Sequence, residues 1–342
     1  MEHRNLGRTG LQVSRLSFGA MTVGDADSGF MKGVTSSEGE ALRVLDRALD
    51  AGMDTIDTAN TYSEGRSEEL LGRWLQGKRE RVVLATKCRF PTRGTEALAR
   101  PHEYGLSRKA ILRACEESLA RLRTDYIDLY QTHMQHQSVP IDETLSALDD
   151  LVRQGKVRYV GCSNYTGGRL VESLWAADRR GYEPYASIQL QWSLGVRDAE
   201  RELIPAASAF GLGVLVWSPL ARGFLSGKYQ RGQPAPEGTR FATWADSYRQ
   251  FDNERGWSLL DTVRAVAARH GASPASVSLA WLLARTECTT IIVGARTVEQ
   301  LDENLRALDL ELAAADIDEL NRASEPAWGY PYDFMRMRSE WP

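Results

Sequence analysis

Two hydrophobic periodicities alternate along the chain. Short apolar runs such as RVVLATK at 81–87, YIDLYQTH at 126–133 and VRYVGCSN at 157–164 are too brief for helices and too apolar for one-sided sheets. Longer amphipathic stretches lie between them and carry helix-start and helix-end residues, for example Ser107 before one stretch and Gly155 after another. This alternation predicts buried parallel strands joined by helices.

The runs predict eight strands. They cover 15–19, 54–57, 82–86, 127–131, 157–161, 186–189, 213–217 and 290–293. A helical stretch follows each strand, and eight regular units over roughly 300 residues fit a closed (β/α)8 barrel better than an open doubly wound sheet. Before the first unit, HRNLGRTGLQVSRL at 3–16 indicates a hairpin that could plug the barrel floor. We therefore expect one domain over 1–342, an α/β TIM barrel with an N-terminal β-hairpin plug and a C-terminal helix and tail (325–342).

Composition narrows the class of protein. Hydrophobic residues make up 42% and charged residues 26% of the 342, as in ordinary globular proteins. Lys plus Arg total 42 against 46 for Asp plus Glu, and no basic stripe is present, which argues against a nucleic-acid partner. The N-terminus lacks a signal-peptide core and no apolar stretch is long enough to cross a bilayer, so we expect a cytoplasmic protein without a membrane partner.

The cysteines and histidines do not suggest a metal site. Cys88, Cys115, Cys162 and Cys288 are scattered without a CxxC pair, which predicts reduced, mostly buried thiols. His133 has another histidine three residues further on, but no third ligand cluster accompanies the two. We expect no bound metal.

Ionisable residues follow neighbouring strands. Asp57 ends the second strand, Tyr62 lies in the loop after it, Lys87 ends the third strand and His133 ends the fourth. Singly, each has an ordinary explanation, such as a turn cap, loop packing, a lysine reaching solvent or a hydrogen-bonded core histidine. In a barrel, however, all four meet at the carboxyl-terminal mouth, where the long connections 88–106 and 228–256 should also lie.

Together these side chains could move a proton. An ammonium at Lys87 would favour the anion of Tyr62 and lower its pKa, and a carboxylate at Asp57 would keep Lys87 charged despite burial. His133 adds a second donor. Two donors aimed at one oxygen suit a carbonyl that becomes an alkoxide under hydride attack.

Six segments resemble the aldo-keto reductases, and together they span nearly the whole chain. They are DTANTYSEGRSEELLG, LATK, DLYQTH, GKVRYVGCSN, VWSPLARGFLSGK and GARTVEQLDEN. The resemblance implies a barrel that binds NADP(H) without a Rossmann fold, and no GxGxxG follows the first strand. It implies that Asp57, Tyr62, Lys87 and His133 are the catalytic residues, with Tyr62 as the acid in reduction.

The resemblance also implies the cofactor contacts. Ser163, Asn164 and Gln189 would bind the nicotinamide carboxamide, and Trp217 would stack on the ring. The other candidates are Ser218, Leu220, Arg222, Gly223 and Lys228 along the pyrophosphate, and Gly294, Arg296, Gln300, Glu303 and Asn304 toward the adenosine. Some family members have a lysine and a serine where this chain has Gly294 and Ala295, so recognition of the 2′-phosphate would rest largely on Arg296 and Thr297. NADP(H) is the expected cofactor, with NAD(H) also possible.

These observations predict a reductase that transfers a hydride from NADPH to a small aldehyde or ketone, with alcohol oxidation as the reverse reaction. One alternative is a dedicated biosynthetic keto-sugar or natural-product ketoreductase. Another is a cofactor-binding regulatory subunit that resembles potassium-channel β subunits. The residues expected to line an apolar substrate pocket are Met21, Trp192, Trp217, Phe241 and Trp244.

Overall fold

The computed structural model describes residues 1–24 and 32–338 of the chain. Residues 339–342, the last part of the expected tail, lie outside the described ranges. Every helix within those ranges is too short or too polar to span a membrane.

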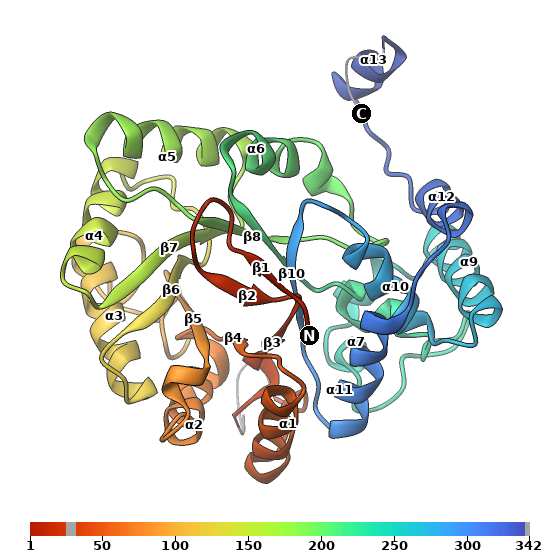
Figure 1. The fold of residues 1–342 in the computed structure, drawn as a ribbon, viewed down its shortest axis with the longest axis horizontal. Coiled ribbons are helices and arrows are strands. Elements are labelled where there is room, and N and C mark those ends of the chain that lie inside the picture. The colour runs from red at the N-terminus through yellow and green to blue at the C-terminus, as the bar shows by residue number, and fades with distance from the viewer. Residues whose placement is uncertain (25–31, 339–342) are drawn as a thin grey trace.

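Eight parallel strands close into a barrel (Figure 1). They are β3 (Leu16–Gly19), β4 (Thr55–Asp57), β5 (Val83–Cys88), β6 (Ile127–Thr132), β7 (Val157–Ser163), β8 (Ser187–Gln191), β9 (Gly213–Trp217) and β10 (Cys288–Val293). They follow one another around the barrel in chain order, and β10 closes it against β3. The predicted (β/α)8 barrel is confirmed, with strand ends displaced by a few residues at most.

Helices surround the barrel. They are α1 (Glu38–Asp50), α2 (Arg66–Trp74), α3 (Arg108–Leu122), α4 (Ile141–Arg153), α5 (Gly167–Arg180), α6 (Leu203–Phe210), α9 (Glu254–Arg269), α10 (Pro274–Leu283), α11 (Val298–Leu305) and α12 (Ala314–Ala323). The side chain of a Ser, Thr or Asn N-cap starts several of them by accepting a hydrogen bond from a backbone N–H three residues further on, as Ser107 does for α3 and Thr297 for α11. The buried faces of these helices and the outward faces of the strands form one hydrophobic cluster.

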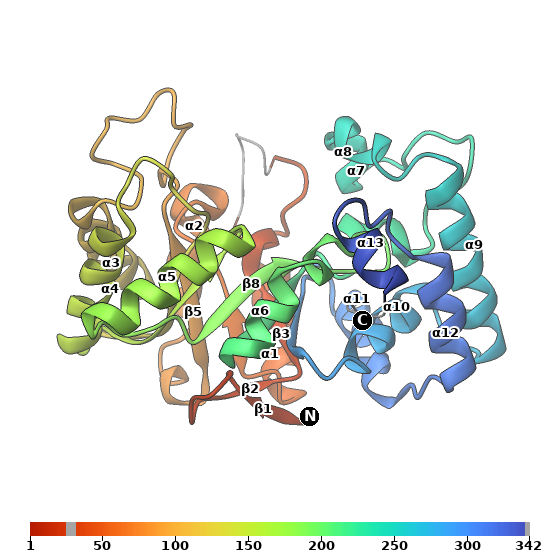
Figure 2. The same cartoon turned by 90° about the horizontal axis from the view of Figure 1, so that it is seen from above.

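The N-terminal hairpin lies across the end of the barrel opposite the long loops (Figure 2). Its strands are β1 (His3–Asn5) and β2 (Gln12–Ser14), paired antiparallel. Leu6, in the turn, is fully buried in the cluster that fills the barrel interior. Gly7 has a positive φ of 58°, and a Cβ there would lie 2.6 Å from the carbonyl oxygen of Gly211, so only glycine allows this close approach. The predicted plug is confirmed.

The loops at the opposite end contain more regular structure than their composition suggested. The 228–256 connection contains two short helices, α7 (Arg240–Thr243) and α8 (Ala245–Arg249), which overhang the barrel mouth in Figure 2. The 88–106 connection begins where β5 ends and lies at the same end of the barrel. Both predicted loops are therefore on the carboxyl-terminal face.

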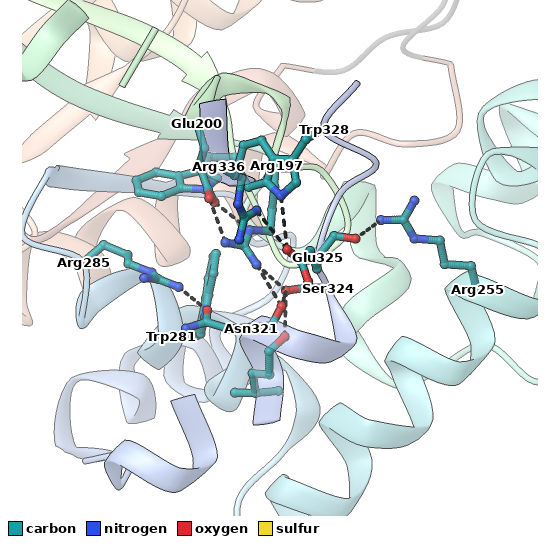
Figure 3. A network of polar contacts seen from close by, with 12 residues as sticks. Arg197, Glu200, Arg255, Trp281, Arg285, Asn321, Ser324, Glu325, Trp328 and Arg336 are labelled. Atoms are coloured by element: carbon teal, nitrogen blue, oxygen red, sulfur yellow. Dashed lines mark hydrogen bonds and ion pairs between the residues drawn. The ribbon is translucent and has the colours of Figure 1, made fainter. Parts of the chain in front are cut away.

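The C-terminal segment leaves the barrel after α12 and ends in α13 (Tyr332–Met337), which projects from the body in Figure 1. A polar network fastens its start (Figure 3). Arg197 donates to both carboxylate oxygens of Glu200 at 2.7 Å, and to the Asn321 carbonyl and the Ser324 hydroxyl at 3.0 Å. The tail is therefore anchored by side chains of the β8–α6 connection.

Candidate active site

A cavity of about 910 Å³ opens at the carboxyl-terminal mouth of the barrel. Most residues assigned to the site from the sequence line it. They are Asp57, Tyr62, His133, Asn164, Gln189, Trp217, Ser218, Leu220, Arg222, Gly223, Lys228, Gly294, Arg296, Gln300, Glu303 and Asn304. Lys87 and Ser163 do not line it, because both are fully buried in the strands behind its wall. The fold therefore gathers nearly all the candidates around one space.

Lys87 lies at the centre of the catalytic group. Its ammonium is 2.5 Å from Asp57 Oδ1, 2.8 Å from the Thr58 carbonyl oxygen and 3.3 Å from the Tyr62 hydroxyl. The lysine side chain is fully buried. Burial pulls the pKa of Lys87 down, but the attraction of Asp57 and Tyr62 outweighs it and raises that pKa, so the group stays an ammonium.

Tyr62 departs from its expected behaviour. The pKa of its phenol is raised, because burial disfavours the phenolate more than the nearby Lys87 favours it. Lys87 does act in the predicted direction, but the predicted net lowering of the Tyr62 pKa is wrong. The phenol therefore keeps its proton at neutral pH and is available as an acid.

His133 follows β6 and faces the same space. Its ring meets the Tyr62 ring edge-on at 5.8 Å and the Phe90 ring at 5.0 Å. Burial, followed by the charges of Lys87 and Arg89, lowers its pKa well below 6.5, so the imidazole is neutral. Its Nδ1 is buried and has no hydrogen-bond partner among the described residues. A neutral imidazole keeps one N–H and can donate a hydrogen bond without carrying charge.

Two glutamines hold the other oxygen of Asp57. Gln189 Nε2 donates to Asp57 Oδ2 at 2.7 Å, and Gln131 Nε2 donates to the same oxygen at 3.2 Å. Gln189 was expected at the nicotinamide, and it also lines the cavity. Gln131 was not among the residues predicted from the sequence. Its signal was a polar residue inside a strand that the pattern predicts to be buried.

The wall beyond Trp217 is built from unusual backbone. Ser218, Ala221 and Arg222 all have positive φ angles, and the Ser218 hydroxyl accepts the Arg222 N–H at 2.8 Å. Trp217 lines the cavity, and its Nε1 is buried without a partner within residues 1–24 and 32–338. Directly after β7, the Asn164 side chain donates to the His133 carbonyl at 2.8 Å. The flat indole thus forms part of the cavity wall.

Three cations lie along the wall of the cavity. Lys228, Arg240 and Arg296 all line it, and none of the three forms an ion pair with a described carboxylate. Burial and the neighbouring arginines lower the pKa of Lys228, and burial and Arg296 lower that of Arg240. Arg240, from α7 in the long loop, is a second residue that the sequence analysis missed. Such mutually repelling cations suit a ligand with several phosphate charges.

The start of α11 forms another part of the cavity wall. The Arg296 N–H donates to Gln300 Oε1 at 2.9 Å, and the Gln300 N–H donates to Thr297 Oγ1 at 3.3 Å. Glu303 and Asn304 line the cavity from the same helix. The flat aromatic wall, the uncompensated cations and the buried polar atoms without partners fit an elongated ligand that carries an aromatic ring and several negative charges.

The expected substrate pocket is correct only in part. Met21 and Trp217 line the cavity, but Trp192, Phe241 and Trp244 do not. Trp192 is buried elsewhere, where its indole N–H donates to Glu200 at 2.7 Å. Phe241 is buried among the rings of Tyr229, Tyr248 and Phe251. Phe90, Pro91, Thr95 and Glu96 of the 88–106 loop line the cavity instead.

The four cysteines are free and buried, as predicted. In the part of the chain that the structure describes, no three His, Cys, Asp or Glu side chains are grouped so that they could hold a metal ion.

The chain belongs to the aldo/keto reductase family, whose model matches residues 15–325. It is 40% identical to an uncharacterized oxidoreductase, YrpG, of Bacillus subtilis (strain 168), over 91% of this chain and 92% of the relative. It is 34% identical to a probable voltage-gated potassium channel subunit beta of Oryza sativa subsp. japonica (91% and 92%). It is 33% identical to a versiconal hemiacetal acetate reductase of Aspergillus parasiticus (97% and 99%). Membership makes the protein an oxidoreductase of a family that generally uses nicotinamide cofactors and reduces carbonyl groups.

Proposed function

We propose that the protein is an NADP(H)-dependent reductase of small aldehydes or ketones, with Asp57, Tyr62, Lys87 and His133 as its catalytic residues. The observation that carries the proposal is the ammonium of Lys87, which lies within hydrogen-bond distance of both Asp57 and the Tyr62 hydroxyl. It adjoins a cavity that is also lined by Lys228, Arg240 and Arg296, three cations without an ion-pair partner among the described residues. A hydride acceptor and a polyanionic cofactor both fit this arrangement.

Each residue has a role in the proposed reaction. When bound, the reduced nicotinamide supplies the hydride. His133, as a neutral N–H donor, orients the carbonyl oxygen, and the Tyr62 hydroxyl gives that oxygen its proton. Lys87 stabilises the phenolate that forms, and Asp57 keeps Lys87 charged. The raised pKa of Tyr62 suits the reductive direction, because the acid is protonated at neutral pH.

The remaining candidate residues are proposed to hold the cofactor. Ser163, Asn164 and Gln189 would bind the carboxamide, and Trp217 would cover one face of the ring. Arg222, Lys228 and Arg240 would neutralise the pyrophosphate, and Arg296 would bind the 2′-phosphate. The unpaired cations favour NADP(H) over NAD(H), since the former carries the additional phosphate. We also infer that the chain forms one domain, because a single core cluster includes residues from Leu16 to Leu320.

A Tyr62→Phe variant tests the catalytic assignment. Turnover of a panel of aldehydes with NADPH should fall about 10²–10⁴-fold, because the acid is removed. NADPH binding, followed by quenching of tryptophan fluorescence, should persist. Tyr165→Phe is a matched control, since it removes a buried hydroxyl that is bonded to Thr132 outside the cavity. Equal turnover in Tyr62→Phe and the control would refute the role of Tyr62.

The relatives support two other functions. The channel-subunit relative from rice suggests a regulatory subunit, and the reductase from Aspergillus suggests a dedicated natural-product enzyme. A regulatory subunit would bind NADPH tightly yet turn over every aldehyde very slowly. A dedicated enzyme would show high kcat/KM for one complex carbonyl compound and low values across the simple panel.

A further inference from the structure

Gln131 is buried among the catalytic residues without reaching the cavity. It lies on β6, in register with Lys87 on β5 and Gly161 on β7, and it is fully buried. A Cβ at Gly161 would lie 3.3 Å from Gln131 Cγ and 2.7 Å from the Ser187 hydroxyl. The absence of a side chain at Gly161 therefore leaves room for Gln131 inside the barrel.

Gln131, Gln189 and Asp57 form a closed triangle of hydrogen bonds. Gln131 Nε2 donates to Asp57 Oδ2 at 3.2 Å, Gln189 Nε2 donates to the same oxygen at 2.7 Å, and Gln189 Nε2 also meets Gln131 Oε1 at 3.3 Å. Both acceptors of the Gln189 amide nitrogen thus belong to the protein. A reversed Gln189 amide would set its oxygen against the Asp57 carboxylate and against Gln131 Oε1, which is unfavourable on both contacts.

The hydrogen bonds of the triangle also determine which atom of Gln189 faces the cavity. With its nitrogen held by the triangle, Gln189 presents its carbonyl oxygen to the cavity that it lines. No described residue donates to that oxygen. A ligand with an amide N–H₂ satisfies it, whereas a ligand with a ketone in the same place leaves two acceptors facing each other.

We propose that Gln131 is a positioning residue that fixes the Gln189 amide, so that the site selects a dinucleotide carrying a carboxamide. Gln131 does this without touching the ligand. It also links Gln189 to Asp57, and through Asp57 to Lys87 and Tyr62. The inference rests on the proposed function, since it concerns how the same cavity recognises its cofactor.

The test compares two probes, NADP⁺ and its 3-acetylpyridine analogue, in which a methyl ketone replaces the carboxamide. Dissociation constants are measured by tryptophan fluorescence quenching. The wild-type protein should prefer NADP⁺. In Gln131→Met, which keeps the length of the side chain and removes both polar groups, affinity for NADP⁺ should fall about fivefold while that for the analogue changes little. The ratio of the two constants is a readout that general loosening of the fold does not move.

Thr132→Val is the matched control. Thr132 is the next residue on β6, equally buried, and it loses a hydrogen bond to the Tyr165 hydroxyl instead. Its ratio should equal that of the wild type. Should Gln131→Met fail to fold, Gln131→Asn serves in its place, because the shorter side chain withdraws the amide from Asp57 and Gln189. It should likewise reduce the preference for NADP⁺ over the analogue.

The outcomes distinguish a failure of the Gln131 role from a failure of the proposed function. An unchanged ratio in a folded Gln131→Met or Gln131→Asn protein would overturn the role of Gln131 and leave the proposed function standing. Equal binding of both probes by the wild-type protein would do the same. Binding of neither probe by the wild-type protein would refute the proposed function and this inference together.

Discussion

Two arginine-rich cavities in this protein differ in how their charge is balanced. In the barrel mouth, Lys228, Arg240 and Arg296 form no ion pair with any described carboxylate, and the pKa of Lys228 and of Arg240 is lowered. The second cavity, of about 510 Å³, is lined in part by the C-terminal segment, whose polar network Figure 3 shows. There Arg197 forms a bidentate pair with Glu200, 2.7 Å on each side.

Among the other arginines of the second cavity, Arg336 forms an ion pair, whereas Arg285 is held by a hydrogen bond and a ring contact and burial lowers its pKa. Arg336 is paired with Glu325 at 2.9 Å and lies over the Trp328 ring. Arg285 has no ion pair among the described residues, but it donates to Asn321 and lies 4.4 Å from the Trp281 ring centroid. Arginines whose partners are supplied by the protein hold elements together, whereas arginines left to repel one another leave a charge for a ligand to neutralise. This difference in charge balance distinguishes the proposed binding site from the structural joint, although the amino-acid types are alike.

The largest expected effect is in the tail network. Arg197→Met should lower the free energy of unfolding by about 3 kcal/mol, because it leaves the nearly buried carboxylate of Glu200 without its cation. NADPH affinity should not change. Urea unfolding and fluorescence titration measure the two quantities. A matched variant, Arg336→Met, breaks a more exposed pair and should cost no more than about 1 kcal/mol. Weaker NADPH binding in Arg197→Met would contradict the separation of the two regions.

The reverse pattern is expected at the mouth. Arg240→Met should weaken NADPH binding about 10- to 100-fold, the loss of one charge-assisted contact. Without NADPH, its unfolding free energy should be unchanged or slightly higher, because a repelling charge is gone. Isothermal titration and urea unfolding of the cofactor-free protein give both numbers. If Arg240→Met destabilised the cofactor-free protein and bound NADPH normally, Arg240 would be a structural residue like Arg197.

The smallest effect concerns His133, a partly buried group without charge compensation. Its pKa in the folded protein lies well below the 6.5 of the free side chain, so the unfolded chain takes up a proton first as the pH falls. Stability should therefore decline below pH 6.5, by about 1.4 kcal/mol for each unit until the folded pKa is reached. His133→Gln should remove that part of the decline between pH 7.5 and 5.5 in urea unfolding. An identical slope in wild type and variant would show that His133 is not buried in neutral form.

Much of the fold could be predicted because its signals are local. The alternation of buried strands and amphipathic helices lies within windows of a few residues, as does the N-cap at Ser107. The polar residues Asp57, Lys87 and His133 could be placed at one mouth because parallel strands in a barrel end on the same face. The two missed residues, Gln131 and Arg240, owe their place in the site to partners on other strands and loops.

The tryptophans show the limit clearly. Trp192 follows β8 and Trp217 ends β9, so both were predicted to line the substrate pocket. One turns outward to Glu200 and Trp281, and the other turns into the cavity. The direction of each ring depends on the loops that follow the strands, so it cannot be predicted from the neighbouring sequence.

The sequence by itself determined the barrel, its hairpin plug and the set of ionisable residues at the mouth, since these follow from hydrophobic periodicity and strand direction. The tertiary structure alone decided the sign of the Tyr62 pKa shift, the neutral state of His133, the triangle around Asp57 and the difference between the two arginine-rich cavities. The physical reason is that electrostatic free energies depend on burial and on distances between atoms far apart in the chain, and only folding sets those quantities.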